Sequence, residues 1–284
     1  MSERLSDVVA RIRSVRQLSS VIGAMRGIAA ARAREARERV EGVRAYAATV
    51  GAAIGQALAL ADDGPSASLR DGRAGHLIIA LCAEQGFAGM FNRRVLDVAE
   101  RALKADGPHR RELFVLGQRG LMAASERGLP VGWSRPMVAH VEEVGALADR
   151  VTEQLYLRIE SGEATRVNVV HAVPSPGEIE VVDRALAPFD YARFPRAKNP
   201  SPPIISLPPR VLLQELAQEY VFADLCEALT LSLAAENEAR MRAMNAAKTN
   251  VAKMLDELIA RSRTLRQEEI TNEIIELGGR RARR

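Results

Sequence analysis

The chain has 284 residues, of which 47% are hydrophobic, 4% aromatic and 27% charged, with a formal net charge of +4. Only two cysteines are present, which excludes a disulfide-framed fold. The scarcity of aromatic residues leaves Ala, Leu and Val to form the core, as is common where helices pack closely. The small excess of positive charge does not by itself indicate a nucleic-acid partner.

Neither the cysteines nor the apolar segments indicate export or membrane insertion. Cys82 and Cys226 form no CxxC pair, which favours two ordinary buried thiols in a reducing cytoplasmic setting. No basic segment followed by an apolar core opens the chain, so we expect no secretory signal. The longest uncharged apolar stretch, Tyr46–Ala61, is mostly Ala and Gly and is shorter than the roughly 18 residues of a membrane span. We therefore expect any membrane association to come through a partner.

Apolar residues recur at every seventh position of the N-terminal end. This spacing is typical of a left-handed coiled coil and predicts a helix from about Arg4 to about Leu58. Leu5, Ile12, Leu18 and Met25 are expected to widen the apolar seam. The recurring positions are Val8, Val15, Ile22, Ala29, Ala36, Val43 and Val50.

The C-terminal end repeats this pattern. All 13 prolines lie between Pro65 and Pro209, and the stretch from Arg210 to Leu277 contains neither proline nor glycine, so we predict a second long helix there. Its heptad positions are Met244, Val251, Leu258 and Leu265. Helices this long must pair with each other or with partners. On periodicity alone, a generic coiled-coil dimerisation rod remains an equal interpretation.

The middle of the chain alternates strand and helix patterns, which predicts a small Rossmann-like α/β domain with a largely parallel sheet. The predicted strands are His76–Cys82, Leu113–Gly117, Arg166–Val173 and 178–184, and the predicted helices are Met90–Lys104, a short one ending near Arg127, and Val144–Glu160. The predicted organisation is an N-terminal coiled-coil helix (1–64), the α/β domain (65–187), a proline-rich linker (188–209) and a C-terminal coiled-coil helix with a basic tail (210–284). The expected fold class is thus two long coiled-coil helices plus a central α/β domain.

No motif in the sequence predicts catalysis. The turn from Gly86 to Gly89 follows a strand and precedes a helix, but it lacks GxGxxG, and none of the lysines (Lys104, Lys198, Lys248, Lys253) follows a glycine as a Walker A loop requires. The four histidines (His76, His109, His140, His171) have no Cys or carboxylate at metal-ligand spacing. We therefore expect no catalytic residue, no cofactor and no metal.

Both ends and the glycine turn resemble the gamma subunit of F-type ATP synthases. The segments that carry the resemblance are Arg11–Val15 with Ala24–Arg32 in the opening helix, Gly86–Asn92, Ser232–Met244 and Arg266–Ile274. The last of these is similar to the family's RQ-x-x-IT-x-E-[IL] signature. The chain departs from the family pattern at 16–18, at Ala83-Glu84 and in its Arg-rich tail, which suggests a divergent bacterial member.

The resemblance implies a non-catalytic rotor shaft. The two terminal helices would wind into a long antiparallel coiled coil that stands inside a ring of alternating alpha and beta subunits. The α/β domain would lie at its base, against epsilon and the membrane c-ring. Ion flow would turn the ring and the shaft, which would drive ATP synthesis on the beta subunits. Such a chain would be a peripheral protein at the cytoplasmic face of the bacterial inner membrane, reaching the membrane only through the complex.

The resemblance also implies five rotor-stator contact residues: Met25, Arg240, Arg266, Gln267 and Thr271. For Met25 a plain seam position is an equal interpretation, and for Arg266 and Gln267 the alternative is a solvated helix face.

Two other functions are compatible with parts of the sequence. A basic coiled-coil nucleic-acid-binding protein would need an uninterrupted basic face, and Glu35, Glu38 and Glu41 interrupt the arginines of the first helix. A small-molecule enzyme built on the α/β domain would need a catalytic site, and no such site can be recognised in the sequence. We therefore expect no nucleic-acid partner.

Overall fold

A computed structural model describes residues 5–61, 75–105, 111–175, 177, 179–197 and 203–281, with the backbone alone at 105 and 276–281. The predicted positions at Arg4, His109, Glu178, Lys198 and the end of the basic tail lie outside the described residues. The chain divides into two compact units: unit 1 comprises Met1–Ala29 with Met241–Arg284, and unit 2 comprises Ala30–Arg240.

Two long helices contribute to both units. Helix α1 runs from Leu5 to Leu60 and helix α5 from Pro209 to Arg281. At ~1.5 Å per residue their lengths are about 84 and 110 Å. Both helices match the prediction closely, and α5 continues past Leu277 through the glycines at 278 and 279.

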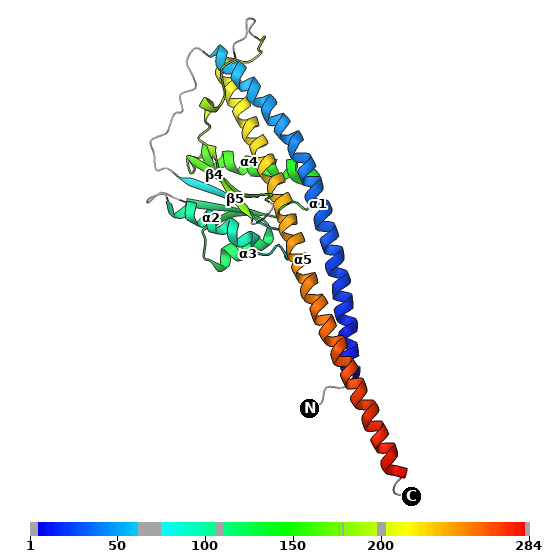
Figure 1. Ribbon diagram of the computed structural model, residues 1–284. Helices are drawn as coiled ribbons and strands as arrows, with labels where there is room; N and C mark the ends of the chain where they lie inside the picture. The colour runs from blue at the N-terminus through cyan, green and yellow to red at the C-terminus, as the bar shows by residue number, and fades with distance from the viewer. Residues whose placement is uncertain are drawn as a thin grey trace. The chain divides into compact units, whose positions relative to one another are not determined.

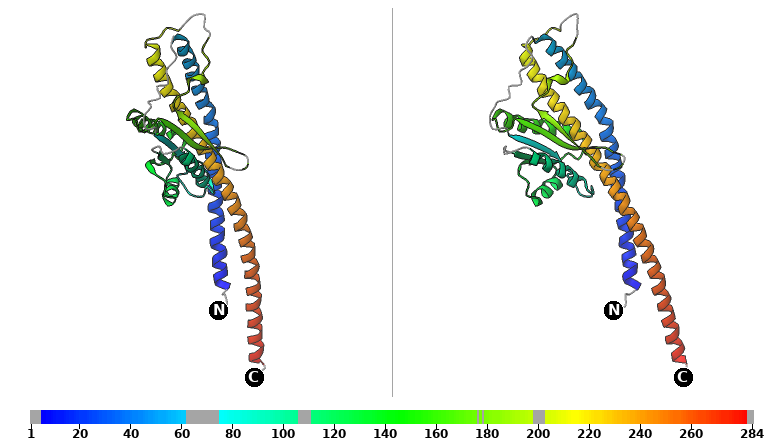
Figure 2. Two further views of the ribbon diagram at one scale, coloured as in Figure 1. Left: turned by 90° about the vertical axis from the view of Figure 1, so that its left-hand side faces the viewer. Right: turned by 60° about the vertical axis from the view of Figure 1, so that its left-hand side comes forward.

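In unit 1 the first turns of α1 pack against the C-terminal half of α5 through an apolar seam. Ile22, Met244 and Val251 are buried there, with Val15 and Ala247 packed beside them. These are heptad positions, or neighbours of them, and their burial confirms the coiled-coil pattern. The last turns of α5 extend past the first described turn of α1 (Figure 2).

Unit 2 holds a five-stranded mixed sheet in the order β3-β2-β1-β4-β5. Strands β1 to β4 are parallel, and β5 pairs antiparallel to β4. The strands are β1 (His76–Leu81), β2 (Arg111–Leu116), β3 (Val131–Arg135), β4 (Arg166–Val173) and β5 (Glu180–Ala187). The remaining helices are α2 (Phe91–Ala105), α3 (Gln118–Glu126) and α4 (Val144–Glu160), with short 3-10 turns at Val141–Glu143 and Tyr191–Arg193.

Both faces of this sheet are covered, which explains why β1 is buried along its whole length. Side chains alternate along the strand: Leu77, Ile79 and Leu81 join one core with residues of α4, and Ile78 and Ala80 join another with residues of α2. Helix α4 accordingly lies on one face, and α2 and α3 on the other (Figure 1). The predicted α/β domain is confirmed.

Helix α5 contributes to both cores of unit 2. Its residues Leu225, Leu229 and Leu233 pack in the core that contains α4, whereas Ala235 and Ala239 belong to the core that contains α2. Between these two sets, Ser232 Oγ donates to the carbonyl oxygen of Leu81, 3.3 Å away at the end of β1. The helix therefore crosses the carboxyl edge of the sheet.

Strand β3 was not predicted from the sequence. It is an edge strand of five residues, VGWSR, and none of them is fully buried. Its Gly132 faces the carboxylate of Glu112, where a Cβ atom would lie 2.2 Å from Oε1. Only two apolar residues, Val131 and Trp133, alternate in this run, and a glycine lies between them, so the pattern is too short to identify a strand.

Part of the proline-rich linker packs on α1. The rings of Phe189, Phe194 and Tyr220 contact one another at centroid distances of 4.9 to 5.8 Å. Gly51 and Gly55 of α1 leave room for this segment, since a Cβ at Gly55 would lie 2.6 Å from the carbonyl oxygen of Pro195. This part of the linker therefore packs against the C-terminal turns of α1.

One described helix, α1, is long and apolar enough to cross a membrane by length and composition alone. An 18-residue window of this helix has a mean hydropathy of 1.2, and 28% of the window is buried within the protein. Residues of α1 pack against α5 in both units.

Candidate functional site

Met25 lies partly buried beside the seam of unit 1, in contact with the cluster of Ile22, Met244 and Val251. Beside it runs a second apolar row on α1: Leu18, Val21 and Ile28 are 48%, 54% and 54% exposed. The spacing of 18, 21, 25 and 28 places these side chains on one helix face. Leu18 was predicted to widen the seam; it is instead half exposed. An exposed apolar row of this kind is typical of surfaces through which proteins contact partners.

Arg266, Gln267 and Thr271 are all exposed near the end of α5. Thr271 Oγ1 donates to the carbonyl oxygen of Gln267, 2.8 Å away on the preceding turn. Three exposed apolar side chains lie on the same part of α5: Ile270, Ile274 and Ile275 are 51%, 63% and 66% exposed. This mixture of isoleucines and polar groups is unlike a plain solvated face and favours a contact surface.

Arg240 has a different setting from the other four predicted contact residues. Only 7% of its side chain is exposed, and it pairs with Glu236 one turn earlier on α5. Its Nε and Nη2 atoms donate to the carbonyl oxygens of Gly86 and Gln85, each 3.2 Å away, and Nη1 donates to Asn237 Oδ1 at 3.0 Å. The guanidinium is therefore bonded inside unit 2, which is not the arrangement of an exposed contact residue.

The glycine turn thus binds the guanidinium group of Arg240. Gly89 and Phe87 adopt positive φ values of 59° and 65°, and the side chain of Asn92 accepts from the backbone N–H of Ala83 at 2.7 Å. The turn presents carbonyl oxygens to Arg240, whereas a phosphate site needs N–H donors. The adjoining cavity is water-sized and is lined mainly by charged and polar side chains, Arg32, Glu84, Glu236, Asn237 and Arg240 among them. This geometry does not favour nucleotide binding.

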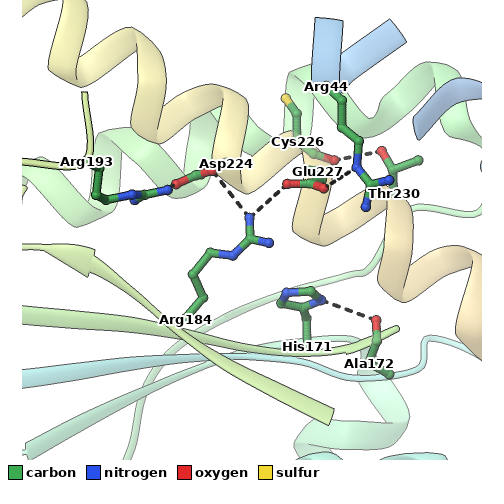
Figure 3. A network of polar contacts seen from close by, with 9 residues as sticks. All are labelled: Arg44, His171, Ala172, Arg184, Arg193, Asp224, Cys226, Glu227 and Thr230. Carbon is green, nitrogen blue, oxygen red and sulfur yellow. Dashed lines mark hydrogen bonds and ion pairs between the residues drawn. The ribbon is translucent and has the colours of Figure 1, made fainter. Parts of the chain in front are cut away.

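A second polar cluster joins three elements of unit 2, as Figure 3 shows. Glu227 of α5 accepts from Arg44 of α1 at 2.7 Å and from Arg184 of β5 at 2.9 Å. Arg184 also donates to Asp224 at 3.3 Å, and Arg193 lies 3.9 Å from that carboxylate. Burial raises the pKa of Asp224, and the two arginines oppose this. Burial also acts to raise the pKa of Glu227, but the hydrogen bonds from Arg44 and Arg184 hold it below its ordinary value.

Sequence reasoning missed this cluster, although α5 carried a signal for it. Asp224 and Glu227 stand at i and i+3 within an otherwise uncharged stretch of the helix, between Val221 and Ala235. Two carboxylates on one face of a buried helix segment need cationic partners. Arg44 and Arg184 could not be assigned from the sequence, because they lie far away along the chain.

His171 lies beside the cluster on β4, fully buried. Its Nδ1 lies 3.2 Å from the carbonyl oxygen of Ala172, and its Nε2 has no hydrogen-bond partner among the described residues. Burial, reinforced by the charge of Arg184, lowers its pKa to about 4.

Folding stability should therefore fall in mild acid. The unfolded chain takes up a proton at His171 near its ordinary pKa of about 6.5, whereas the folded chain resists it until about pH 4, so stability is lost as pH falls between these values. We expect a loss on the order of 2 kcal/mol at pH 5 relative to pH 7 from this residue. Urea unfolding of the wild type and of His171→Gln, which does not titrate, measures this. An equal pH dependence in both proteins contradicts it.

Among the residues that the structure describes, no group of three or more His, Cys, Asp or Glu side chains could hold a metal ion.

Solved structures that share this fold come from the rotors of ATP synthases. The rotor of the Euglena gracilis mitochondrial ATP synthase has this fold, with a TM-score of 0.61 at 13% identity, covering 94% of this chain and 98% of that one. A chain of the OSCP/F1/c-ring assembly of the same synthase gives a TM-score of 0.67 at 12% identity, covering 98% and 93%.

The family follows from the sequence match. The ATP synthase family model covers residues 4–282. The ATP synthase gamma chain of Solibacter usitatus is 30% identical over 96% of both chains, and that of Moorella thermoacetica is 29% identical over the same share. This chain belongs to the ATP synthase gamma-chain family, and it is a central-stalk subunit that is not catalytic by itself.

Proposed function

We propose that this chain transmits torque between a membrane ion ring and a catalytic head. Its partners are the alpha and beta subunits of the hexameric head, the epsilon subunit and the c-ring. It lies at the cytoplasmic face of the bacterial inner membrane and is held there by the complex. The observation that carries the proposal is the family match along 4–282, which includes both helices and the α/β domain between them.

The helices have the properties that a drive shaft requires. The described part of α5 has no proline after its first residue, and the kinks that proline causes are therefore avoided. In unit 1, apolar and polar side chains that are exposed on the isolated chain would be covered by the surrounding subunits. We assign the rotor-stator contacts to Met25, Arg266, Gln267 and Thr271. We assign Arg240 a different role, because its guanidinium is bonded to other groups of unit 2.

Nucleic-acid binding is the less well supported alternative. Arginines of α1 that would meet phosphates are paired with carboxylates of α5: Arg37 pairs with Glu238 and Arg44 with Glu227. Each paired arginine contributes less to a basic surface, and salt-dependent binding to duplex DNA needs such a surface.

Co-purification tests the proposal. We expect an affinity tag on this chain to recover alpha, beta, epsilon and c subunits together from detergent-solubilised membranes, and to recover ATPase activity with them. Recovery of the chain alone, or with nucleic acid that is released by salt, would contradict the proposal.

A further inference from the structure

Glu227 is the point at which three elements of unit 2 meet. Its Oε1 accepts from Arg44 Nε of α1 at 2.7 Å, and its Oε2 accepts from Arg184 Nη1 of β5 at 2.9 Å. Glu227 itself belongs to α5, and only 13% of its side chain is exposed. One carboxylate therefore joins both long helices to the sheet, and both of its oxygen atoms are used.

Asp224 strengthens the side of this contact that faces the sheet. It stands one turn earlier on α5, with 7% of its side chain exposed, and accepts from the same Arg184 nitrogen at 3.3 Å. Arg184 thus meets two successive carboxylates of α5, which fixes the position of the helix along β5. We call Arg44, Arg184, Asp224 and Glu227 the Glu227 joint (Figure 3).

Stability alone does not account for these charges. Val221, Leu225 and Leu229 already bury this part of α5 against the sheet, and ion pairs in such places are often no more stabilising than apolar residues of the same size. The hydrophobic effect is non-directional, so burial of apolar residues alone does not prescribe the distance and angle between particular groups of two elements. Charge-assisted hydrogen bonds have preferred distances and angles, so they resist displacement of one element along another.

We propose that Glu227 is a positioning residue for torque transfer: its contacts with Arg44 and Arg184 hold α1, α5 and the sheet in register, so that the α/β domain and both helices turn as one body. The inference rests on the proposed function. The load passes from the sheet through Arg184 to Glu227, and from Glu227 to α1 through Arg44. Both helices continue from unit 2 into unit 1 without a break in their hydrogen bonding.

The test uses the whole complex in vesicles, with ATP-driven ion pumping measured against an opposing ion gradient. Glu227→Gln keeps the size of the side chain and removes its charge. We expect ATP hydrolysis that is not accompanied by pumping to rise about tenfold under load, because a neutral amide at this position forms weaker hydrogen bonds with the two arginines than the carboxylate does. Without an opposing gradient we expect near-normal pumping. The matched control is Asp97→Asn, which removes an exposed carboxylate paired with Arg127 wholly within the α/β domain.

The outcomes separate the inference from the proposed function. The inference that Glu227 positions the helices for torque transfer is supported if Glu227→Gln hydrolyses ATP without pumping under load. This result must come with an unchanged melting temperature of the complex and with normal coupling in Asp97→Asn. If Glu227→Gln does not assemble, Arg184→Gln, which leaves the Arg44 contact in place, decides by the same measurement. Tight coupling in the assembled variant, or an equal loss of coupling in the control, overturns the inference. A wild-type complex that lacks this chain, or that hydrolyses ATP without pumping, contradicts the proposed function instead.

Discussion

Replacement of Arg240 by Met is expected to lower the free energy of unfolding by about 3–5 kcal/mol, because it removes one partner of a buried ion pair. The carboxylate of Glu236 is 4% exposed, and burial already raises its pKa. Without the guanidinium this group must stay charged without its partner or take up a proton. The carbonyl oxygens of Gln85 and Gly86 also lose the donors that they have in the wild type.

Urea denaturation of the purified chain measures the effect of Arg240→Met. Arg93→Met is the matched control, because Arg93 is exposed on α2 and its loss should change the stability by no more than about 0.5 kcal/mol. Arg240→Lys keeps the charge but cannot form the same fork of hydrogen bonds, so we expect an intermediate loss. Equal stability of Arg240→Met and Arg93→Met would contradict the buried position of Arg240.

Replacement of Met25 by Lys is expected to slow ion-driven ATP synthesis by tenfold or more. Met25 lies beside the exposed row of Leu18, Val21 and Ile28, which we assign to contact with the head. An ammonium at this position would pair with a carboxylate of a surrounding subunit in one rotational position. Charge pairs of this kind at protein interfaces have coupling energies of about 1.5–7 kcal/mol. Each 1.4 kcal/mol by which the pair stabilises one rotational position slows rotation out of that position about tenfold.

Reconstituted complexes driven by an imposed ion gradient measure this synthesis rate. Met25→Leu is the matched control, because it keeps an apolar side chain of similar volume and should leave synthesis nearly unchanged. If Met25 is only a seam residue of the coiled coil, the Lys variant assembles poorly but synthesises ATP at a normal rate per assembled complex, and the assignment fails.

Local patterns in the sequence predicted the fold well. The heptad spacing identified the buried seam at Ile22, Met244 and Val251, because coiled-coil packing depends on residues close together in the chain. The buried strand at His76–Leu81 was equally clear, since His76 is followed by five successive apolar residues. The edge strand β3 carried no such pattern and was missed.

The candidate site was less predictable, because its contacts are long-range. Glu227 meets Arg44 and Arg184, which lie 183 and 43 residues away along the chain. The resemblance to the gamma family suggested an outward role for Arg240, but exposure depends on which side of α5 meets the glycine turn, and that is set by tertiary packing. The contacts predicted for Met25, Arg266, Gln267 and Thr271 remain predictions, because they depend on subunits other than this chain.

Observation of rotation tests the central claim most directly. Ser125 is exposed on α3, so Ser125→Cys provides a reactive thiol on the α/β domain, whereas Cys82 and Cys226 are buried and burial raises the pKa of each to about 12. A bead attached to this thiol, in a complex immobilised through its beta subunits, should turn continuously in one direction while ATP is hydrolysed. ATP hydrolysis at the normal rate with a stationary bead would contradict the account of this chain as the rotating shaft.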